Sequence, residues 1–239
     1  MIDTSKSPQR IASMFDAIAA RYDFLNHLLS AGIDRRWRRR AIEALQLTGR
    51  ETVLDLCTGT ADVAIAAIKA GTPPGAHRVV GIDFAGEMLR LGLEKVRARH
   101  LDDRIALVRG DATRIPAADA RFDALTIAFG IRNVEDTAAA CREMSRVLRS
   151  GGRVAVLEFA IPAQPVIRHI YRWYFDHVLP RLGRLVSRHR GAYNYLPASV
   201  TAFAKPDEFM TILRHAGFRD VAAVPLTFGV VFLYTGRRG

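Results

Sequence analysis

The sequence predicts an α/β fold in which a doubly wound, mostly parallel sheet of seven strands carries helices on both faces. From Glu51 onward, short apolar runs alternate with helical stretches, and this alternation is typical of a parallel sheet. The apolar segment from Val221 to Tyr234 is interrupted by Pro225 and Gly229, which indicates a C-terminal antiparallel hairpin. With 239 residues, 49% of them hydrophobic, the chain can bury a full core without disulfides.

The first predicted element is an N-terminal helical region, residues 8–47, with an expected break near residues 30–32. The predicted strands are Thr52–Leu56, Arg78–Asp83, Ile105–Arg109, Ala124–Phe129 and Arg153–Phe159. The predicted helices include Met88–Arg99, Thr137–Leu148, a long excursion from Pro165 to about Leu196, and Pro206–Ala216. We interpret Gly151 and Gly152 as the glycine stop of a helix before the fifth strand.

No repeat, linker or break in composition marks a second domain, so we expect one domain over residues 1–239. Its expected parts are an N-terminal helical cover (1–47), a ligand-binding core (51–160), a helical lid insertion (161–200), and a C-terminal helix and hairpin (201–239).

A nucleoside-binding crevice is indicated by two acidic residues and a tight turn. Asp55 lies in the first predicted strand, Thr58-Gly59-Thr60 turns into the next helix, and Asp83 ends the second strand. A turn close to the ligand, followed by an acid that accepts from ribose hydroxyls, is the layout of such a site. A dinucleotide site would need Gly-x-Gly-x-x-Gly facing a pyrophosphate, and this turn has one central glycine. A ligand without phosphate fits better, and S-adenosylmethionine is the candidate.

Two further strand ends supply candidate contacts. Asp111 and Ala112 follow the third strand, where the carboxylate can accept from the exocyclic amine of adenine and the backbone amide can donate to a ring nitrogen. The alternative is that Asp111 only caps the following turn. Arg132 and Asn133 follow the fourth strand and are placed to meet a substrate; the alternative is that they cap the helix beginning near Asp136.

The formal net charge of +11 favours acidic partners: RNA, anionic lipid headgroups or an anionic substrate. Much of the excess lies in two arginine clusters. The first surrounds Trp37 and consists of Arg35, Arg36, Arg38, Arg39 and Arg40. The second runs among Tyr171, Trp173, Tyr174 and Phe175 and consists of Arg168, Arg172, Arg181, Arg184, Arg188 and Arg190. The alternative for each cluster is an ordinary solvated helix face.

Composition also bears on cofactors and location. Cys57 and Cys141 are the two cysteines, which excludes a disulfide framework and favours a reducing cytosol. The seven histidines are scattered, and no Cys/His cluster has the spacing of metal ligands, so we expect no metal. Residues 1–7 lack the apolar core of a secretory signal, and no apolar run reaches the ~18 residues that a spanning helix needs.

Several motifs occur in the order typical of one family. They are Arg21-Tyr22-Asp23-Phe24-Leu25-Asn26, Ser30 seven residues before Trp37, Leu54-Asp55-Leu56-Cys57-Thr58-Gly59-Thr60-Ala61-Asp62, Phe129-Gly130-Ile131-Arg132-Asn133-Val134 and Arg146-Val147-Leu148-x-x-Gly151-Gly152-x-x-x-x-Leu157-Glu158. Over almost its whole length the chain resembles the ubiquinone/menaquinone biosynthesis C-methyltransferases, a family that includes demethylmenaquinone methyltransferases. It departs from the usual pattern at Leu25, Asp34, Ala128, Ser150 and Ala160. Because Ala128 stands where a serine often contacts the cofactor, that contact is not carried over.

The resemblance implies a class I S-adenosylmethionine-dependent methyltransferase that methylates a ring carbon of a polyprenylated quinol. The acceptor would be demethylmenaquinol, the methoxy-benzoquinol precursor of ubiquinol, or both. The cofactor contacts implied are Gly59, Thr60, Asp83, Asp111 and Ala112, the catalytic residues Arg132 and Asn133, and the substrate-pocket residues Tyr22, Asn26 and Tyr195. Arg132 would stabilise a substrate phenolate, because a guanidinium that stays protonated cannot act as the base.

A prenylated substrate gives the second arginine cluster a role. Apolar side chains recur there at helical spacing, at Ile167, Ile170, Tyr171, Tyr174, Phe175 and Val178. Such a face can accept the prenyl tail or rest on an anionic bilayer, although it could instead pack on the sheet. We therefore expect a cytoplasmic protein, peripheral to the inner face of the cell membrane, with no specific nucleic-acid partner; a homo-oligomer is left open.

Two other classes of function are weighed against this one. An RNA methyltransferase would share the cofactor and suit the charge, but it would ordinarily carry a binding module or a Pro-rich tetrapeptide on the fourth strand. A nicotinamide-dependent oxidoreductase would need the glycine fingerprint that the turn lacks.

Overall fold

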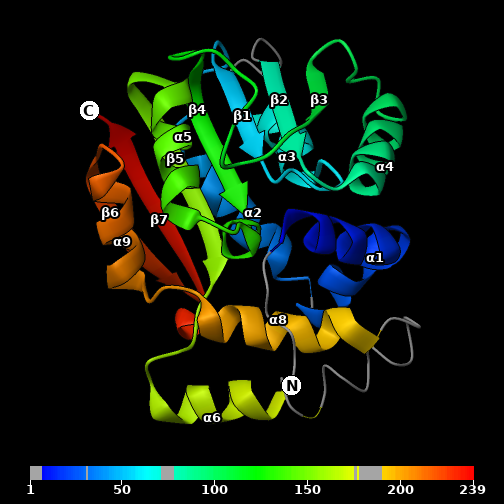
Figure 1. Ribbon diagram of the computed structural model, residues 1–239, viewed down its shortest axis with the longest axis vertical. Helices are drawn as coiled ribbons and strands as arrows, with labels where there is room; N and C mark the ends of the chain where they lie inside the picture. The colour runs from blue at the N-terminus through cyan, green and yellow to red at the C-terminus, as the bar shows by residue number, and fades with distance from the viewer. Residues whose placement is uncertain (1–6, 31, 71–77, 175–176, 178–189) are drawn as a thin grey trace.

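The computed structural model describes residues 7–30, 32–70, 78–174, 177 and 190–239 (Figure 1). In this part of the chain seven strands form one sheet in the order β3-β2-β1-β4-β5-β7-β6. The strands are β1 (Thr52–Leu56), β2 (Arg78–Asp83), β3 (Ile105–Arg109), β4 (Phe122–Ala128), β5 (Leu148–Phe159), β6 (Phe218–Leu226) and β7 (Val231–Arg238). The first five strands are parallel to one another, and β7 is antiparallel to β5 and β6. The predicted fold class is confirmed.

Helices cover both faces of the sheet (Figure 1). One face carries α2 (Asp34–Ala44), α3 (Asp62–Ala70) and α4 (Gly86–Arg97), and the other carries α5 (Thr137–Val147) and α9 (Pro206–His215). Because successive side chains of a strand point to opposite faces, β4 serves both cores. Ala124 packs among the residues of α2 and α3, whereas Leu125 and Ile127 pack among those of α5 and α9.

In the described part of the chain, three helices lie beyond the carboxyl ends of the parallel strands (Figure 1). They are α1 (Pro8–Leu29), α6 (Pro165–Trp173) and α8 (Arg190–Ala202). Short 3-10 turns also lie at this edge: η1 (Ile131–Asn133) follows β4, and η3 (Thr227–Gly229) joins β6 to β7. Part of the predicted lid, residues 175–176 and 178–189, lies outside the described residues. Among the helices that are described, none is both long and apolar enough to cross a bilayer.

The start of β5 differs from the prediction. The sequence suggested a helix that ends at a glycine stop, but α5 ends at Val147 and Leu148 already pairs with Phe122 of β4. The register then shifts, and the strand passes through Gly151, whose φ is +75°. The two glycines therefore lie within an irregular strand and do not end a helix. The strand begins at Leu148, before the predicted start at Arg153, because Leu148 pairs with β4.

Candidate active site

A cavity lies between α1 and the carboxyl ends of β1, β2, β3 and β4. The strand order reverses between β1 and β4, and ligands of open α/β sheets bind at such a switch point. The cavity is partly open to solvent, and its lining combines apolar side chains with a few polar groups, as small-molecule sites do. Strand ends supply its polar lining, and α1 supplies an apolar wall.

The loop after β1 reaches the cavity in an unusual backbone conformation. Cys57, Gly59 and Ala61 have φ of 55°, 55° and 65°, in the left-handed region. Gly130, at the end of β4, lets the two strand ends approach closely, because a Cβ at this position would lie 2.3 Å from the Cβ of Cys57. The backbone of Gly59 is thereby brought to the cavity, where the sequence predicted a cofactor contact.

Asp83 lines the cavity and fixes this loop. One carboxylate oxygen accepts the Gly59 N–H at 2.8 Å, and the other accepts the Ala85 N–H at 2.9 Å. Burial raises the pKa of Asp83, although these hydrogen bonds act in the opposite direction. The residue predicted to bind ribose therefore also positions the turn beside it.

Asp55 lies beneath the same loop, and it is 1% exposed. Its carboxylate accepts the hydroxyl of Thr58 at 2.6 Å. Burial raises the pKa of Asp55 to about 7, with the Thr58 hydrogen bond opposing this shift. Asp55 does not line the cavity and acts as a support for the loop.

Asp111 and Ala112 both line the cavity. One carboxylate oxygen of Asp111 accepts the backbone N–H and the hydroxyl of Thr113, each at 2.8 Å. The two interpretations of Asp111 drawn from the sequence are therefore compatible, since a residue that caps a turn also lies at the cavity. Ala112, 7% exposed, contributes part of the apolar lining.

The structure separates the two predicted catalytic residues. Asn133 lines the cavity, and its side-chain oxygen is buried without a hydrogen-bond partner among the described residues. Arg132 does not line the cavity. Its Nη1 lies 2.7 Å from Oε1 of Glu158 and donates to the carbonyl of Phe129 at 2.5 Å, and its Nε donates to Ser199 at 3.4 Å. Asn133 is thus available to a ligand, whereas Arg132 is engaged inside the protein.

The three predicted substrate-pocket residues also differ. Tyr22 of α1 lines the cavity. Asn26 belongs to α1, but its side chain lies outside what the structure describes. Tyr195 of α8 is 5% exposed and lies outside the cavity lining, and its hydroxyl has no hydrogen-bond partner among the described residues. Burial raises the pKa of Tyr195, and the charge of Arg132 opposes this shift.

Thr60, a predicted cofactor contact, has a different set of partners. Its hydroxyl donates to Asp23 of α1 at 2.6 Å and accepts from Lys95 of α4 at 2.9 Å. Thr60 is 3% exposed and does not line the cavity. The structure therefore brings Gly59, Asp83, Asp111, Ala112, Asn133 and Tyr22 together at one cavity and leaves Thr60, Arg132 and Tyr195 beside it.

Sequence reasoning missed most of the apolar wall and the anion that holds Arg132. Ile11, Phe15 and Tyr22 of α1 line the cavity, and their helical spacing in the sequence could have indicated a common face. Glu158 is 0% exposed. Glu158 ends one of the motifs that carry the family resemblance, but nothing in that motif indicated a contact with Arg132, since the contact joins two separate strand ends.

The fold and the cavity at the switch point define a class I S-adenosylmethionine-dependent methyltransferase. Among solved structures, the fold matches that of an S-adenosylmethionine-dependent methyltransferase from Thermotoga maritima, described as a possible histamine N-methyltransferase. Its TM-score is 0.65, its identity is 15%, and the match covers 96% of this chain and all of that one. At this identity the likeness concerns the fold alone.

A profile of the ubiE/COQ5 methyltransferase family matches residues 3–238, and the chain belongs to this family. It is 45% identical to the ubiquinone/menaquinone biosynthesis C-methyltransferase UbiE of Geobacter sulfurreducens, over 100% of this chain and 92% of that protein. It is 40% identical to the demethylmenaquinone methyltransferase of Bacteroides fragilis, over 98% of this chain and 94% of that one. The chain is therefore an S-adenosylmethionine-dependent C-methyltransferase, as the resemblance implied.

Proposed function

We propose that the protein methylates a ring carbon of a polyprenylated quinol, either demethylmenaquinol, the methoxy-benzoquinol precursor of ubiquinol, or both. The observation that carries the proposal is full-length family membership with relatives named for these pathways. The cavity supports the proposal, because its lining combines apolar side chains of α1 with polar groups at the strand ends. A prenylated quinol has matching parts, an apolar tail and a ring with oxygen substituents.

The residues present fit S-adenosylmethionine at the strand ends. Asp83 and Asp111 line the cavity. In this proposal the carboxylate of Asp83 accepts from the ribose hydroxyls, and that of Asp111 accepts from the adenine amine. Ile82 and Ala112 offer apolar contacts for the ring. The unpartnered oxygen of Asn133 is an acceptor that a ligand donor would satisfy, because a buried polar atom without a partner costs free energy.

When bound, the cofactor supplies an electrophilic methyl group, and the protein must hold an electron-rich ring carbon about 3–3.5 Å from it. Asn133 and Tyr22 both line the cavity, and in this proposal the side-chain oxygen of Asn133 accepts from a ring hydroxyl. Arg132 serves the reaction by one of two routes. It holds η1, and so Asn133, in place through Glu158, or it exchanges Glu158 for a substrate oxygen and stabilises the phenolate.

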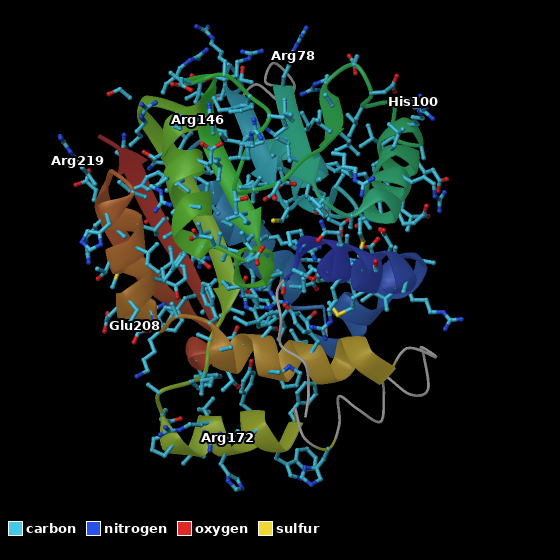
Figure 2. The ribbon with its side chains drawn as sticks, in the orientation of Figure 1. Arg78, His100, Arg146, Arg172, Glu208 and Arg219 are labelled. Atoms are coloured by element: carbon cyan, nitrogen blue, oxygen red, sulfur yellow. The ribbon has the colours of Figure 1, made fainter. Side chains whose placement is uncertain are left out.

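Contact with an anionic membrane is proposed for α6. Three apolar side chains, at spacings of four and three residues, are exposed: Val166 by 62%, Ile170 by 57% and Trp173 by 55%. This face shares Ile170 with the predicted one, but Ile167, Tyr171 and Tyr174 are half-buried, and Phe175 and Val178 lie outside the described residues. Arg172 extends from α6, at the end of the molecule opposite Arg78 (Figure 2).

In the first arginine cluster, four side chains are exposed and one is engaged in ion pairs. Arg35, Arg36, Arg39 and Arg40 are exposed on α2 and can meet anionic headgroups. Arg38 is not available, because its side chain, 12% exposed, pairs with Asp62 at 2.7 Å and Asp34 at 3.4 Å. The proposed location is the inner face of the cell membrane, reached by these two surfaces.

Methyl transfer from labelled S-adenosylmethionine tests the proposal. Purified protein is offered a prenylated naphthoquinol, a prenylated benzoquinol, their unprenylated analogues and total RNA. Label on a quinol ring carbon supports the proposal and identifies the preferred acceptor. Label on RNA with none on a quinol would overturn it.

A further inference from the structure

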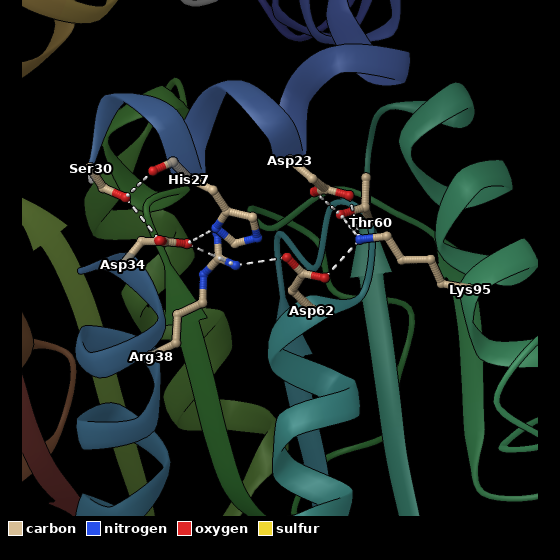
Figure 3. A network of polar contacts seen from close by, with 8 residues as sticks. All are labelled: Asp23, His27, Ser30, Asp34, Arg38, Thr60, Asp62 and Lys95. Atoms are coloured by element: carbon tan, nitrogen blue, oxygen red, sulfur yellow. Dashed lines mark hydrogen bonds and ion pairs between the residues drawn. The ribbon is translucent and has the colours of Figure 1, made fainter. Parts of the chain in front are cut away.

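A polar network fastens α1 to the cofactor side of the cavity (Figure 3). Asp23 lies one residue beyond Tyr22, which lines the cavity. One oxygen of Asp23 accepts the hydroxyl of Thr60 at 2.6 Å, and the other lies 2.5 Å from the Nζ of Lys95. Lys95 also donates to Thr60 at 2.9 Å and to Asp62 at 2.7 Å. Three helices and the loop after β1 therefore meet at one ammonium group.

The network returns to α1 by a second route (Figure 3). Asp62 accepts from Arg38 at 2.7 Å, and Arg38 lies 3.4 Å from Asp34. Asp34 in turn lies 2.8 Å from Nδ1 of His27 and accepts the hydroxyl of Ser30 at 2.8 Å. The C-terminal half of α1 and the chain just after it are thus held at both Asp23 and the His27–Ser30 turn.

The contacts are partly shielded from water, which makes them stronger than exposed ion pairs. The side chains of Asp23, Lys95 and Asp62 are 28%, 23% and 29% exposed. Burial would raise the pKa of Asp62, but the charges and hydrogen bonds of Arg38 and Lys95 lower it. Polar groups that share several partners in such a setting reinforce one another.

We propose that Asp23 and Lys95 are positioning residues that hold α1 as a wall over the bound cofactor, and that Thr60 is the link. The backbone of Gly59 lines the cavity, and the next residue, Thr60, donates a hydrogen bond to Asp23 of α1. The loop that contacts the cofactor therefore also sets the position of α1. Closing α1 and ordering the loop therefore favour each other. This inference concerns the cofactor site and is independent of which acceptor is methylated.

The test is the binding kinetics of S-adenosylhomocysteine to Asp23→Asn, Thr60→Val and the double variant. Asp23→Asn keeps the size of the side chain and removes the charge that Lys95 meets, and Thr60→Val removes only the hydroxyl. We expect each single variant to dissociate the ligand about five- to tenfold faster with little change in association rate, since charge-assisted hydrogen bonds of this kind are lost. The double variant should show an effect smaller than the product of the two single effects, because Asp23 and Thr60 contact each other and share Lys95 as a partner.

A matched control and two further readouts separate positioning from general damage to the protein. Glu94→Gln, next to Lys95 but paired with Arg90 at the surface, is the matched control and should bind like the parent. Bound ligand should protect the parent from tryptic cleavage after Arg21 and fail to protect the two single variants. In methyl transfer, KM for S-adenosylmethionine should rise while kcat at saturation holds.

Two outcomes would overturn the proposal. If Thr60→Val weakens binding and Asp23→Asn does not, Thr60 acts by touching the cofactor, as the sequence alone predicts. If both variants keep the parental dissociation rate and tryptic protection, the network does not couple α1 to the cofactor. Neither outcome depends on finding the methyl acceptor, so a failure here and a failure of the quinol proposal are distinguishable.

Discussion

Arg132 and Glu158 form a buried ion pair at the ends of neighbouring strands, with their side chains 6% and 0% exposed. The guanidinium also lies over the ring of Phe159, 5.4 Å from its centroid. The N–H of Arg132 donates to the same carboxylate at 3.2 Å, so Glu158 holds both ends of this residue. The pair therefore fixes η1, whose last residue, Asn133, lines the cavity.

The first prediction concerns this pair. Arg132→Ala should retain S-adenosylhomocysteine binding but lose turnover by a factor on the order of 100, as when one preorganised donor is removed. It should also lower the free energy of unfolding by about 3–5 kcal/mol, because it leaves Glu158 buried and unpaired. Arg132→Lys should recover little turnover, since an ammonium cannot reproduce the planar fork. Calorimetric titration, urea unfolding and a quinol methylation assay supply the three measurements.

Two more variants distinguish the routes by which Arg132 acts. Glu158→Gln frees the guanidinium while keeping an acceptor, so it should preserve turnover if Arg132 meets the substrate and reduce it if the pair only positions η1. The double variant R132M/E158M should regain much of the lost stability, because a well-packed apolar pair can replace a buried ion pair. If this double variant also regains turnover, Arg132 has no chemical role.

The second prediction is that Asp83→Ala weakens S-adenosylhomocysteine binding roughly tenfold or more, while Asp119→Ala leaves it unchanged. Asp83 lines the cavity and holds the Gly59 turn, so its loss removes a ligand contact and loosens the loop. Asp119 pairs with Arg146 at the surface, where its side chain is 75% exposed. Isothermal titration measures both. Parental affinity in Asp83→Ala would mean that the cofactor site is misassigned.

The parts of the fold set by local pattern were predictable from the sequence. The bounds of β1, β2 and β3 agree with the prediction, because each is a short apolar run bounded by turn residues. Their carboxyl ends share one edge, which brings Gly59, Asp83 and Asp111 to one cavity. The start of β5 was not predictable in this way, because its pairing with Phe122 prevails over a local glycine signal.

The direction of individual side chains was not predictable either. Arg132 follows the fourth strand, as expected, yet it turns toward Glu158, which lies 26 positions later in the chain. Thr60 likewise turns toward Asp23, 37 positions earlier. Ion pairs and hydrogen bonds between residues so far apart in the sequence depend on how separate elements pack. The sequence around either residue does not indicate which partner it will contact.

The third prediction concerns pH. The pKa of Asp55 is raised by burial to about 7, against about 3.9 in an unfolded chain. Between these values the folded protein keeps a proton that the unfolded chain releases, so the free energy of unfolding falls as pH rises from about 4 to 7, by up to ~1.4 kcal/mol per unit. Asp55→Asn mimics the neutral form and can still accept from Thr58, so it should remove this component. The variant should be more stable than the parent at pH 8 and similar to it at pH 4.

Urea unfolding across pH 4 to 8 measures this component, with Asp119→Asn as a surface control that should follow the parental curve. The same pH dependence in Asp55→Asn and the parent would show that Asp55 is not the titrating group. If the free energy of unfolding of Asp55→Asn exceeded that of the parent by the same amount at every pH, the cause would be repacking and not proton linkage.

The fourth prediction is reversible binding to anionic vesicles through α6 and the exposed arginines of α2. Each basic side chain near an anionic surface contributes about 1 kcal/mol, and this attraction decays within a Debye length of ~8 Å at physiological salt. Burial of Val166, Ile170 and Trp173 should add a part that salt does not remove. Cosedimentation should therefore be strong at low salt and reduced, but not abolished, at high salt.

Two sets of substitutions separate the apolar and the electrostatic contributions to vesicle binding. Replacing Val166, Ile170 and Trp173 with Ser should abolish the salt-resistant part, whereas Val224→Ser, which removes an apolar side chain 48% exposed on β6, should not. Replacing Arg168 and Arg172 with Gln should weaken binding at low salt only. Equal, salt-insensitive binding to neutral and anionic vesicles would contradict the electrostatic part. If neither vesicle is bound, the exposed face of α6 has another use, and the prenyl tail must reach the cavity from a soluble carrier or a micelle.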